Sequence, residues 1–185
     1  MRPYTGSLML LAAGIVVGTL ADRVPVREAL TLGGYRVLAA DFHTHSSTWS
    51  DSAITPIGLV LEARHQGLDA IAITGHNQLL EGRVGRWFSK YVAGMTVIPG
   101  QEILSPTHHL LGIGITRVVE WRDDPAAKIA EIHRQGGVAI AAHPLEAFWP
   151  AYAPVMDQLD GSEICHPMVF SGDAHQRTFE AFAGR

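Results

Sequence analysis

The sequence has a single cysteine, Cys165, among 185 residues, which excludes an intramolecular disulfide and a thiolate zinc cluster. It also has no cluster of lysine or arginine, and its formal net charge is −4, so nothing predicts binding to duplex nucleic acid. Low-complexity tracts are absent, and 47% hydrophobic content allows one globular domain with a core but leaves little room for a second. Any metal site must use the ten histidines and the carboxylates.

The N-terminus lacks charge over residues 4–21, and residues 8–20 are almost entirely apolar. Preceded by Arg2 and ending in small residues that suit cleavage, this stretch resembles a signal sequence or a short membrane anchor. A full span needs ~20 apolar residues, so both readings stay open, and a buried core helix is a third that the glycines disfavour. We expect residues 1–34 to be a signal or anchor with a linker, and residues 35–185 to be a domain outside the cytoplasm.

In the globular part, apolar runs that suit buried strands alternate with segments of helical period. This pattern predicts an α/β fold, with a parallel sheet or barrel covered by helices. Thr55 and Asp124 are predicted N-caps, because each precedes a proline and a periodic segment. Strands are predicted at 36–42, 68–74, 97–98, 110–115, 138–142 and 162–165, and helices at 56–66, 125–135 and 176–183.

Polar residues that bind metals lie just past the C-terminal ends of these predicted strands. His43 and His45 follow the first strand, His76 the second, Glu102 the third, and His143 the strand at 138–142. In a barrel of parallel strands the loops at that end face one shared cavity. We therefore expect these side chains to form one site.

The pair His43 and His45 is two residues apart, so on an extended chain both imidazoles point to the same side and can hold one cation. Asp51 follows six residues later. Zinc, manganese and iron accept imidazole and carboxylate together, and a bridging carboxylate such as Glu102 can hold two cations about 3.5–4 Å apart. Alone, the histidine pair is equally consistent with a surface feature without function.

The other candidate ligands are weaker individually. His76 and His143 each stand at the first polar position after an apolar run, which a core histidine explains poorly in both cases. Glu102 follows an apolar segment and His109 precedes one, although either fits an ordinary loop residue. We interpret His108 as only a neighbour of the site.

Together the segments DFHTHSSTWSD, AITGHN, PGQEI, HHLLGIGI and AAHP resemble the PHP (polymerase and histidinol phosphatase) family, in order and approximate spacing, over residues 41–163. The resemblance implies a distorted seven-stranded β/α barrel with two or three divalent metals, manganese, iron or zinc, at the strand ends. It implies that Glu102 bridges the metals and that further ligands are His43 with His45 on one metal, Asp51 with His76 on another, and His109 and His143. Glu102 and His143 are also our candidate catalytic residues.

Two positions depart from the family pattern. Gly75 stands where the family usually has an acidic residue, which removes a partner of the metal site or the substrate. The family's last motif, a Ser-Asp-x-His type pair, resembles residues 172–175, but these follow Glu163 too closely for an intervening helix and strand. We therefore expect a barrel that lacks its last strand, with Asp173 and His175 outside the metal cluster on a helix beginning near Ser171.

The resemblance implies a phosphoesterase, in which metal-bound hydroxide attacks the phosphorus of a small phosphorylated substrate. Two alternatives stay open: a catalytically silent, metal-stabilised scaffold, and hydrolysis of an amide or another ester. Arg83, Arg86 and Lys90 either face a phosphate or a base, or form a solvated helix face whose aromatic side is buried. The aromatic residues of this stretch are Trp87 and Phe88. Trp149 either walls the pocket or only packs.

Overall fold

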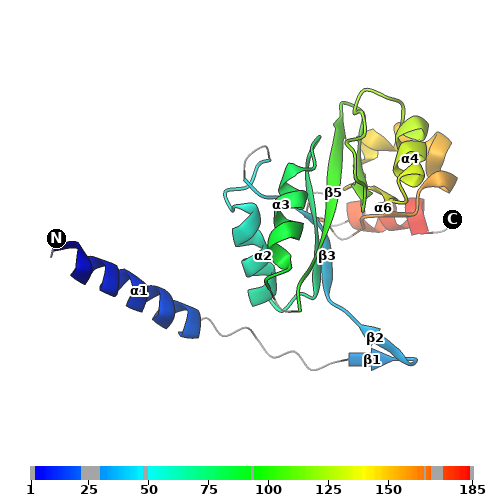
Figure 1. Cartoon of the computed structure of the whole chain (residues 1–185). Helices are drawn as coiled ribbons and strands as arrows, with labels where there is room; N and C mark the ends of the chain where they lie inside the picture. The colour runs from blue at the N-terminus through cyan, green and yellow to red at the C-terminus, as the bar shows by residue number, and fades with distance from the viewer. Residues whose placement is uncertain are drawn as a thin grey trace.

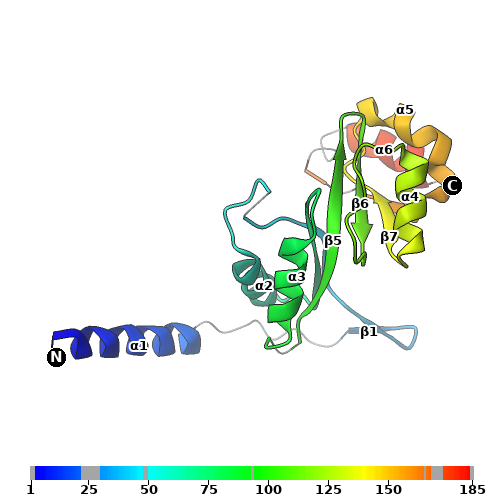
Figure 2. The ribbon, with the colours of Figure 1, turned by 45° about the horizontal axis from the view of Figure 1, so that its top comes forward.

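The computed structural model describes residues 3–21, 30–47, 50–92, 94–164, 166–167 and 173–183. Helix α1 (Pro3–Ala21) lies apart from the sheet in Figures 1 and 2, and the side chains described in it are exposed. Strands β1 (Leu30–Leu32) and β2 (Tyr35–Val37) form an antiparallel hairpin in what the sequence predicted to be a linker and its junction with the domain. Within the described residues, no helix has the length and apolar character needed to cross a membrane.

The main sheet has six strands in the order β3-β4-β5-β6-β7-β8. Pairs β3–β4, β4–β5 and β7–β8 are parallel, but β6 runs antiparallel to both β5 and β7. This corrects the prediction of an all-parallel barrel, because β5 turns directly into β6 as a hairpin. The strands are β3 (Ala40–Thr44), β4 (Ala70–His76), β5 (Thr96–Ser105), β6 (His108–Ile113), β7 (Val138–Ala141) and β8 (Gly161–Ser162).

Helices pack on the outer face of this sheet (Figure 1). The two predicted caps are confirmed: Thr55 Oγ1 accepts from the Gly58 amide at 3.1 Å, and Asp124 Oδ1 accepts from the Ala127 amide at 2.9 Å. The helices are α2 (Pro56–His65), α3 (Leu80–Ser89), α4 (Pro125–Arg134), α5 (Trp149–Tyr152), α6 (Asp173–Ala183) and the 3₁₀ turns η1 (Glu146–Phe148) and η2 (Ala153–Gln158).

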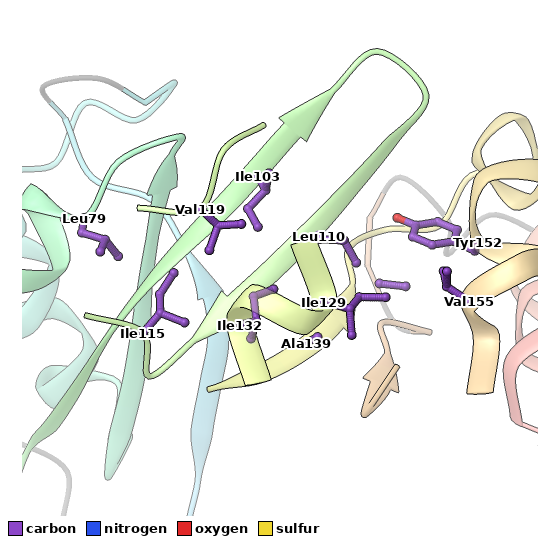
Figure 3. Packing of buried hydrophobic residues seen from close by; sticks show 11 residues of the cluster. Leu79, Ile103, Leu110, Ile115, Val119, Ile129, Ile132, Ala139, Tyr152 and Val155 are labelled. Atoms are coloured by element: carbon purple, nitrogen blue, oxygen red, sulfur yellow. The ribbon is translucent and has the colours of Figure 1, made fainter. Parts of the chain in front are cut away.

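Three apolar clusters hold these layers together. The largest packs α4 and η2 against β5–β7, and Figure 3 shows Ile129 and Ile132 of α4 facing this cluster together with Leu110 and Tyr152. A second joins α2 to β4 and β5, and a third lies on the inner face of the sheet around Leu111. Burial of apolar surface on both faces fixes the strands, and hence the side chains at their ends.

Strand β5 is far longer than the predicted segment 97–98. Pro99 suggested a break, but Pro99 occupies a register position opposite Ile73, and its carbonyl accepts from the Gly114 amide at 2.9 Å. As a result Glu102 lies inside a strand and not after one. The short strand β8 ends at Ser162, and Cys165, in the predicted strand, lies outside the described residues.

The ends of the sheet are β3 and β8, and among the described residues no strand joins them. Phe42 on β3 is 46% exposed, as expected for an edge strand. Helix α6 begins at Asp173, close to the predicted start at Ser171. The side chains of Asp173 and His175 lie outside what the structure describes, so their predicted exclusion from the cluster stays a prediction.

Candidate metal centre

Glu102 lies at the centre of a cluster of imidazoles and is only 2% exposed. Three Nε2 atoms face its Oε2, at 3.3 Å from His43, 3.3 Å from His45 and 3.2 Å from His76. Two further nitrogens face its Oε1, at 3.1 Å from His109 Nδ1 and 2.9 Å from His143 Nε2. One buried carboxylate is therefore shared by two groups of histidines.

The sheet brings these residues together. His76 ends β4 and is paired in register with Glu102 on β5. Glu102 is paired in turn with Leu111 on β6, and His109 lies two residues before Leu111, so it points to the same face. His43 is the penultimate residue of β3, and His143 follows β7 by two residues. The structure thus brings together the four histidines of the strand-end prediction, His43, His45, His76 and His143, whereas Glu102 and His109 come from an antiparallel hairpin.

Charges in the cluster are strongly coupled. Burial opposes ionisation of Glu102, but hydrogen bonds from His109, His143 and His43 outweigh it and hold the pKa of Glu102 far below its usual range. Burial likewise lowers the pKa of His43, yet hydrogen bonds to Glu102 and Glu163 raise this pKa to about 9. Glu102 is thus a fixed negative charge, and positive charge next to it stabilises the cluster. Bound cations would supply the same positive charge.

Glu163, which the sequence reasoning did not select, joins the cluster from the opposite end of the sheet. Its Oε1 lies 2.7 Å from His43 Nδ1, and its Oε2 accepts from the His143 amide at 2.6 Å. The ring of His166, also missed, stacks on that of His43 with centroids 5.5 Å apart and lies tilted against that of His143 with centroids 4.8 Å apart. Glu163 directly follows β8, but the sequence prediction placed it inside a strand at 162–165, so the strand-end pattern did not select it.

The backbone beside the site is strained. His143 has a φ of 24° and Asn77 a φ of 50°, in the left-handed region that residues other than glycine rarely adopt. The Glu163 carboxylate holds the first through the His143 amide. The Asn77 side chain anchors the second, because its Oδ1 accepts from the Leu104 amide at 3.0 Å. Both strained residues flank Glu102. His143 is held by a side chain from another segment, and Asn77 by its own side chain on the backbone of β5.

No family model matches this chain. An uncharacterized protein of Methanocaldococcus jannaschii is 28% identical over 139 residues, which cover 69% of this chain and 81% of that protein. Among solved structures, a two-domain protein of Bacteroides vulgatus containing a predicted PHP-like metal-dependent phosphoesterase superposes with a TM-score of 0.71 at 23% identity. The match covers 86% of this chain and 53% of that one. The chain has the PHP-like fold. It spans about half the length of the Bacteroides protein.

Two more solved structures share this fold. A candidate metal-dependent phosphoesterase of Bifidobacterium adolescentis has a TM-score of 0.59 at 17% identity, over 79% of this chain and 83% of that one. An amidohydrolase of Chromobacterium violaceum, with bound sulfate and no metal, has a TM-score of 0.59 at 16% identity, over 77% and 82%. At these identities the comparisons establish the fold, and they confirm the predicted PHP resemblance at that level.

The donor set of this PHP-like centre fits divalent cations. Three groups have nitrogen and oxygen atoms within 4.8 Å of one another, and Glu102 or His43 takes part in each. His143 Nδ1 is buried without a hydrogen-bond partner, so one polar atom of the centre is unsatisfied in the described part of the chain. Imidazole with carboxylate suits zinc, manganese and iron. The groups are His43–Glu102–His143, His45–His76–Glu102 and His43–Glu163–His166.

Asp51 lies at the rim of the centre. Its side chain is 76% exposed, and its Oδ1 is 3.9 Å from His76 Nε2. Ser50 beside it is closer, because its Oγ accepts from the His76 amide at 3.2 Å. The structure therefore places Asp51 next to His76, as the resemblance implied, but only loosely, and its role as a ligand stays a prediction.

At Gly75, where the PHP family pattern usually has an acidic residue, the end of the Gln78 side chain occupies the space of a Cβ atom. A Cβ atom at Gly75 would lie 1.8 Å from Gln78 Nε2 and 2.8 Å from Glu81 Oε2. The Glu81 carboxylate lies next to the Gln78 side chain. Polar groups of this chain therefore fill the space in which the family pattern has an acidic side chain.

His108 points away from the centre, to the outer face of the hairpin. Its Nε2 lies 3.1 Å from the Nζ of Lys128, a fully buried lysine that also donates to Ser105 Oγ at 2.6 Å. Burial, together with Lys128, lowers the pKa of His108 to about 4. This placement agrees with the interpretation of His108 as a neighbour and not a ligand.

Proposed function

We propose that this chain is a metal-dependent hydrolase that acts as a phosphoesterase on small phosphorylated substrates. The observation that carries the proposal is the buried Glu102 carboxylate, each oxygen of which faces a separate group of histidine nitrogens. Such an arrangement suits a carboxylate that bridges two cations. Glu102 itself lies inside β5, and the histidines His43, His76 and His143 come to it from the ends of β3, β4 and β7.

Bound divalent cations would polarise phosphoryl oxygens and lower the pKa of a bound water towards neutrality. His43, His45, His76, His109 and His143 with Glu102 would hold two of them, and Glu163 with His166 would add donors for a third. Next to His76 a cavity of about 390 Å³ opens, lined also by Asn77, Gln78 and Leu80. Its size admits a small substrate. Trp149 does not line this cavity, and its Nε1 donates to the Pro144 carbonyl at 2.8 Å.

The fold neighbours support this reaction class. Two are named as predicted or candidate metal-dependent phosphoesterases, and the third holds sulfate, a tetrahedral anion of the shape of phosphate. That third neighbour is named an amidohydrolase, which favours amide hydrolysis as the second candidate reaction for the same centre. A metal-loaded but silent scaffold is the remaining alternative.

The test uses the full-length protein reconstituted with manganese, iron or zinc. We expect at least two equivalents of metal by elemental analysis and hydrolysis of p-nitrophenyl phosphate, with both reduced in Glu102→Gln. His108→Ala is the matched control, because His108 lies on the opposite face of the same hairpin. Less than one equivalent would refute a multinuclear centre, bound metal without turnover would indicate a scaffold, and cleavage of a p-nitroanilide alone would indicate an amidase.

We also propose that the N-terminal segment exports or anchors the domain outside the cytoplasm. The support is the sequence of α1, which is uncharged over residues 4–21, and the exposure of its apolar side chains, such as Leu8 and Val17. Apolar side chains exposed along a whole helix need a lipid or protein environment.

A further inference from the structure

A second pocket, distinct from the metal centre, lies between α3 and the loop after β6. It has a volume of about 290 Å³. Its lining comes from Arg83, Arg86, Trp87 and Lys90 on or next to α3, from Pro99 on β5, and from Ile115 and Thr116. We call it the basic pocket.

The basic pocket opens on the outer face of the sheet. Pro99 and Glu102 are three residues apart on β5, and this odd spacing points their side chains to opposite faces. The metal centre uses the inner face and the basic pocket the outer one. None of the histidines around Glu102 lines the pocket, so a ligand there would not touch the metals.

Three cations line the pocket and no acidic residue does. Arg83, Arg86 and Lys90 are spaced three and four residues apart, so they lie on one side of the helix, where like charges repel. In the described part of the chain, the arginine–carboxylate ion pairs all involve other arginines and none involves these three cations. Arg83 is held at the wall, because its Nη2 donates to the Thr116 carbonyl at 2.5 Å. A bound anion would neutralise this charge.

Of the two aromatic residues expected on the buried side of this helix, Phe88 packs against the cluster that joins α2 to β4 and β5, but Trp87 is exposed. Trp87 is 55% exposed and Tyr91 is 72% exposed, with ring centroids 5.7 Å apart in an edge-on contact. An exposed indole beside cations offers a planar ring a stacking surface next to a phosphate site. Pro99 and Ile115 add apolar wall, which an inorganic anion would not need.

We propose that the basic pocket binds a small phosphorylated ligand with an aromatic ring, of the nucleoside monophosphate class. The cations would hold the phosphate, and Trp87 would stack on the base. The volume of about 290 Å³ suits a small ligand. The net charge of −4 disfavours a long polyanion as the ligand, because the rest of the surface repels it. This site is independent of the proposed hydrolase activity.

The probe is the 5′-phosphonate analogue of AMP, in which carbon replaces the bridging oxygen so that a phosphoesterase cannot cleave it. Calorimetry with the full-length protein should give a binding event that persists in His45→Ala. This event should be weakened at least tenfold for ribose 5-phosphate, which lacks the base, and for adenosine, which lacks the phosphate. Equal binding of all three compounds, or no binding of the analogue at millimolar concentration, would refute the proposal. Tighter binding of a single-stranded oligonucleotide would mean that the pocket binds nucleic acid and not a small ligand, and would overturn the proposal.

Variants of exposed residues locate the ligand without disturbing the core. Trp87→Ala should weaken binding roughly 5- to 100-fold, the range for loss of one base–aromatic stack, and Arg86→Gln about tenfold, as for one charged phosphate contact. Arg122→Gln is the matched control, since Arg122 is exposed, already paired with Glu120, and outside the pocket. Unchanged affinity in both pocket variants would place the ligand elsewhere and overturn the assignment. Binding should persist in His45→Ala, whether or not that variant hydrolyses phosphate esters.

Discussion

Replacing Glu163 by glutamine tests whether one carboxylate orients two residues of the centre. Glu163 accepts from the His143 amide at 2.6 Å and lies 2.7 Å from His43 Nδ1. If Nδ1 carries the proton, His43 Nε2 is free to bind a cation beside Glu102, which is the usual carboxylate–histidine–metal arrangement. A glutamine amide has one oxygen and one NH₂. Whichever way it turns, its NH₂ faces either the His143 amide or the Nδ1 proton, and one donor loses its acceptor.

The expected effect is a weaker metal centre and not an unfolded protein. Loss of such an orienting partner typically lowers metal affinity about 10- to 100-fold, or roughly 1.4–2.7 kcal/mol. The assay is competition for zinc between the full-length protein and a chromophoric chelator. Thermal unfolding of the metal-free proteins, measured in parallel, separates this effect from a general loss of stability.

Glu62→Gln is the matched control, because Glu62 is an exposed carboxylate on α2, bonded to Gln66 and remote from the cluster. Its zinc affinity should stay within about twofold of the wild type, below the range for an orienting partner. An affinity of Glu163→Gln equal to that of the control would refute the orienting role. Equal losses of stability and affinity, in contrast, would mean that Glu163 only holds the fold.

Three further predictions concern the fold and the N-terminus. Gly82→Ala should destabilise the protein by about 1–3 kcal/mol, because a Cβ there would lie 2.9 Å from Pro99 Cα; Gly14→Ala, with nothing within 4 Å, is the control in chemical denaturation. Burial lowers the pKa of Lys128 below 10.5, so the folded state releases this proton before the unfolded one does. The free energy of unfolding should then rise with pH in the window below 10.5, and Lys128→Met should lose that rise. A reporter active only outside the cytoplasm should work when fused to residues 1–34, and a cytosolic fusion would contradict the export proposal.

Local chemistry made parts of the fold predictable. Helices α2 and α4 begin at the predicted residues because Thr55 and Asp124 cap them through bonds only three residues long. The direction of β6 was not predictable in the same way. An apolar run indicates a buried strand but not whether it runs parallel or antiparallel, which depends on pairing with β5 and on the short turn between them.

The centre shows the same division between local and distant information. His76 and His143 were predictable as members because each ends an apolar strand. Glu163 lies just after β8, but the strand predicted at 162–165 ran through it, and its partner His43 is 120 residues away in the sequence. Which nitrogen of His43 faces Glu102 depends on that distant contact, so the sequence predicted the residue but not the atom.

The contact between Glu163 and His43 also has a structural consequence, because these residues belong to the two ends of the sheet. Glu163 continues from β8 and His43 belongs to β3, strands that are not paired with each other. The sheet must therefore curl for the carboxylate to reach the imidazole. Cations bound through His43 would favour that curled state, since a ligand that binds only the folded form stabilises it by about 4 kcal/mol at a thousand times its dissociation constant. The centre and the closure of the sheet are thus coupled: whatever holds His43 in place for the metals also holds the two edges of the sheet together.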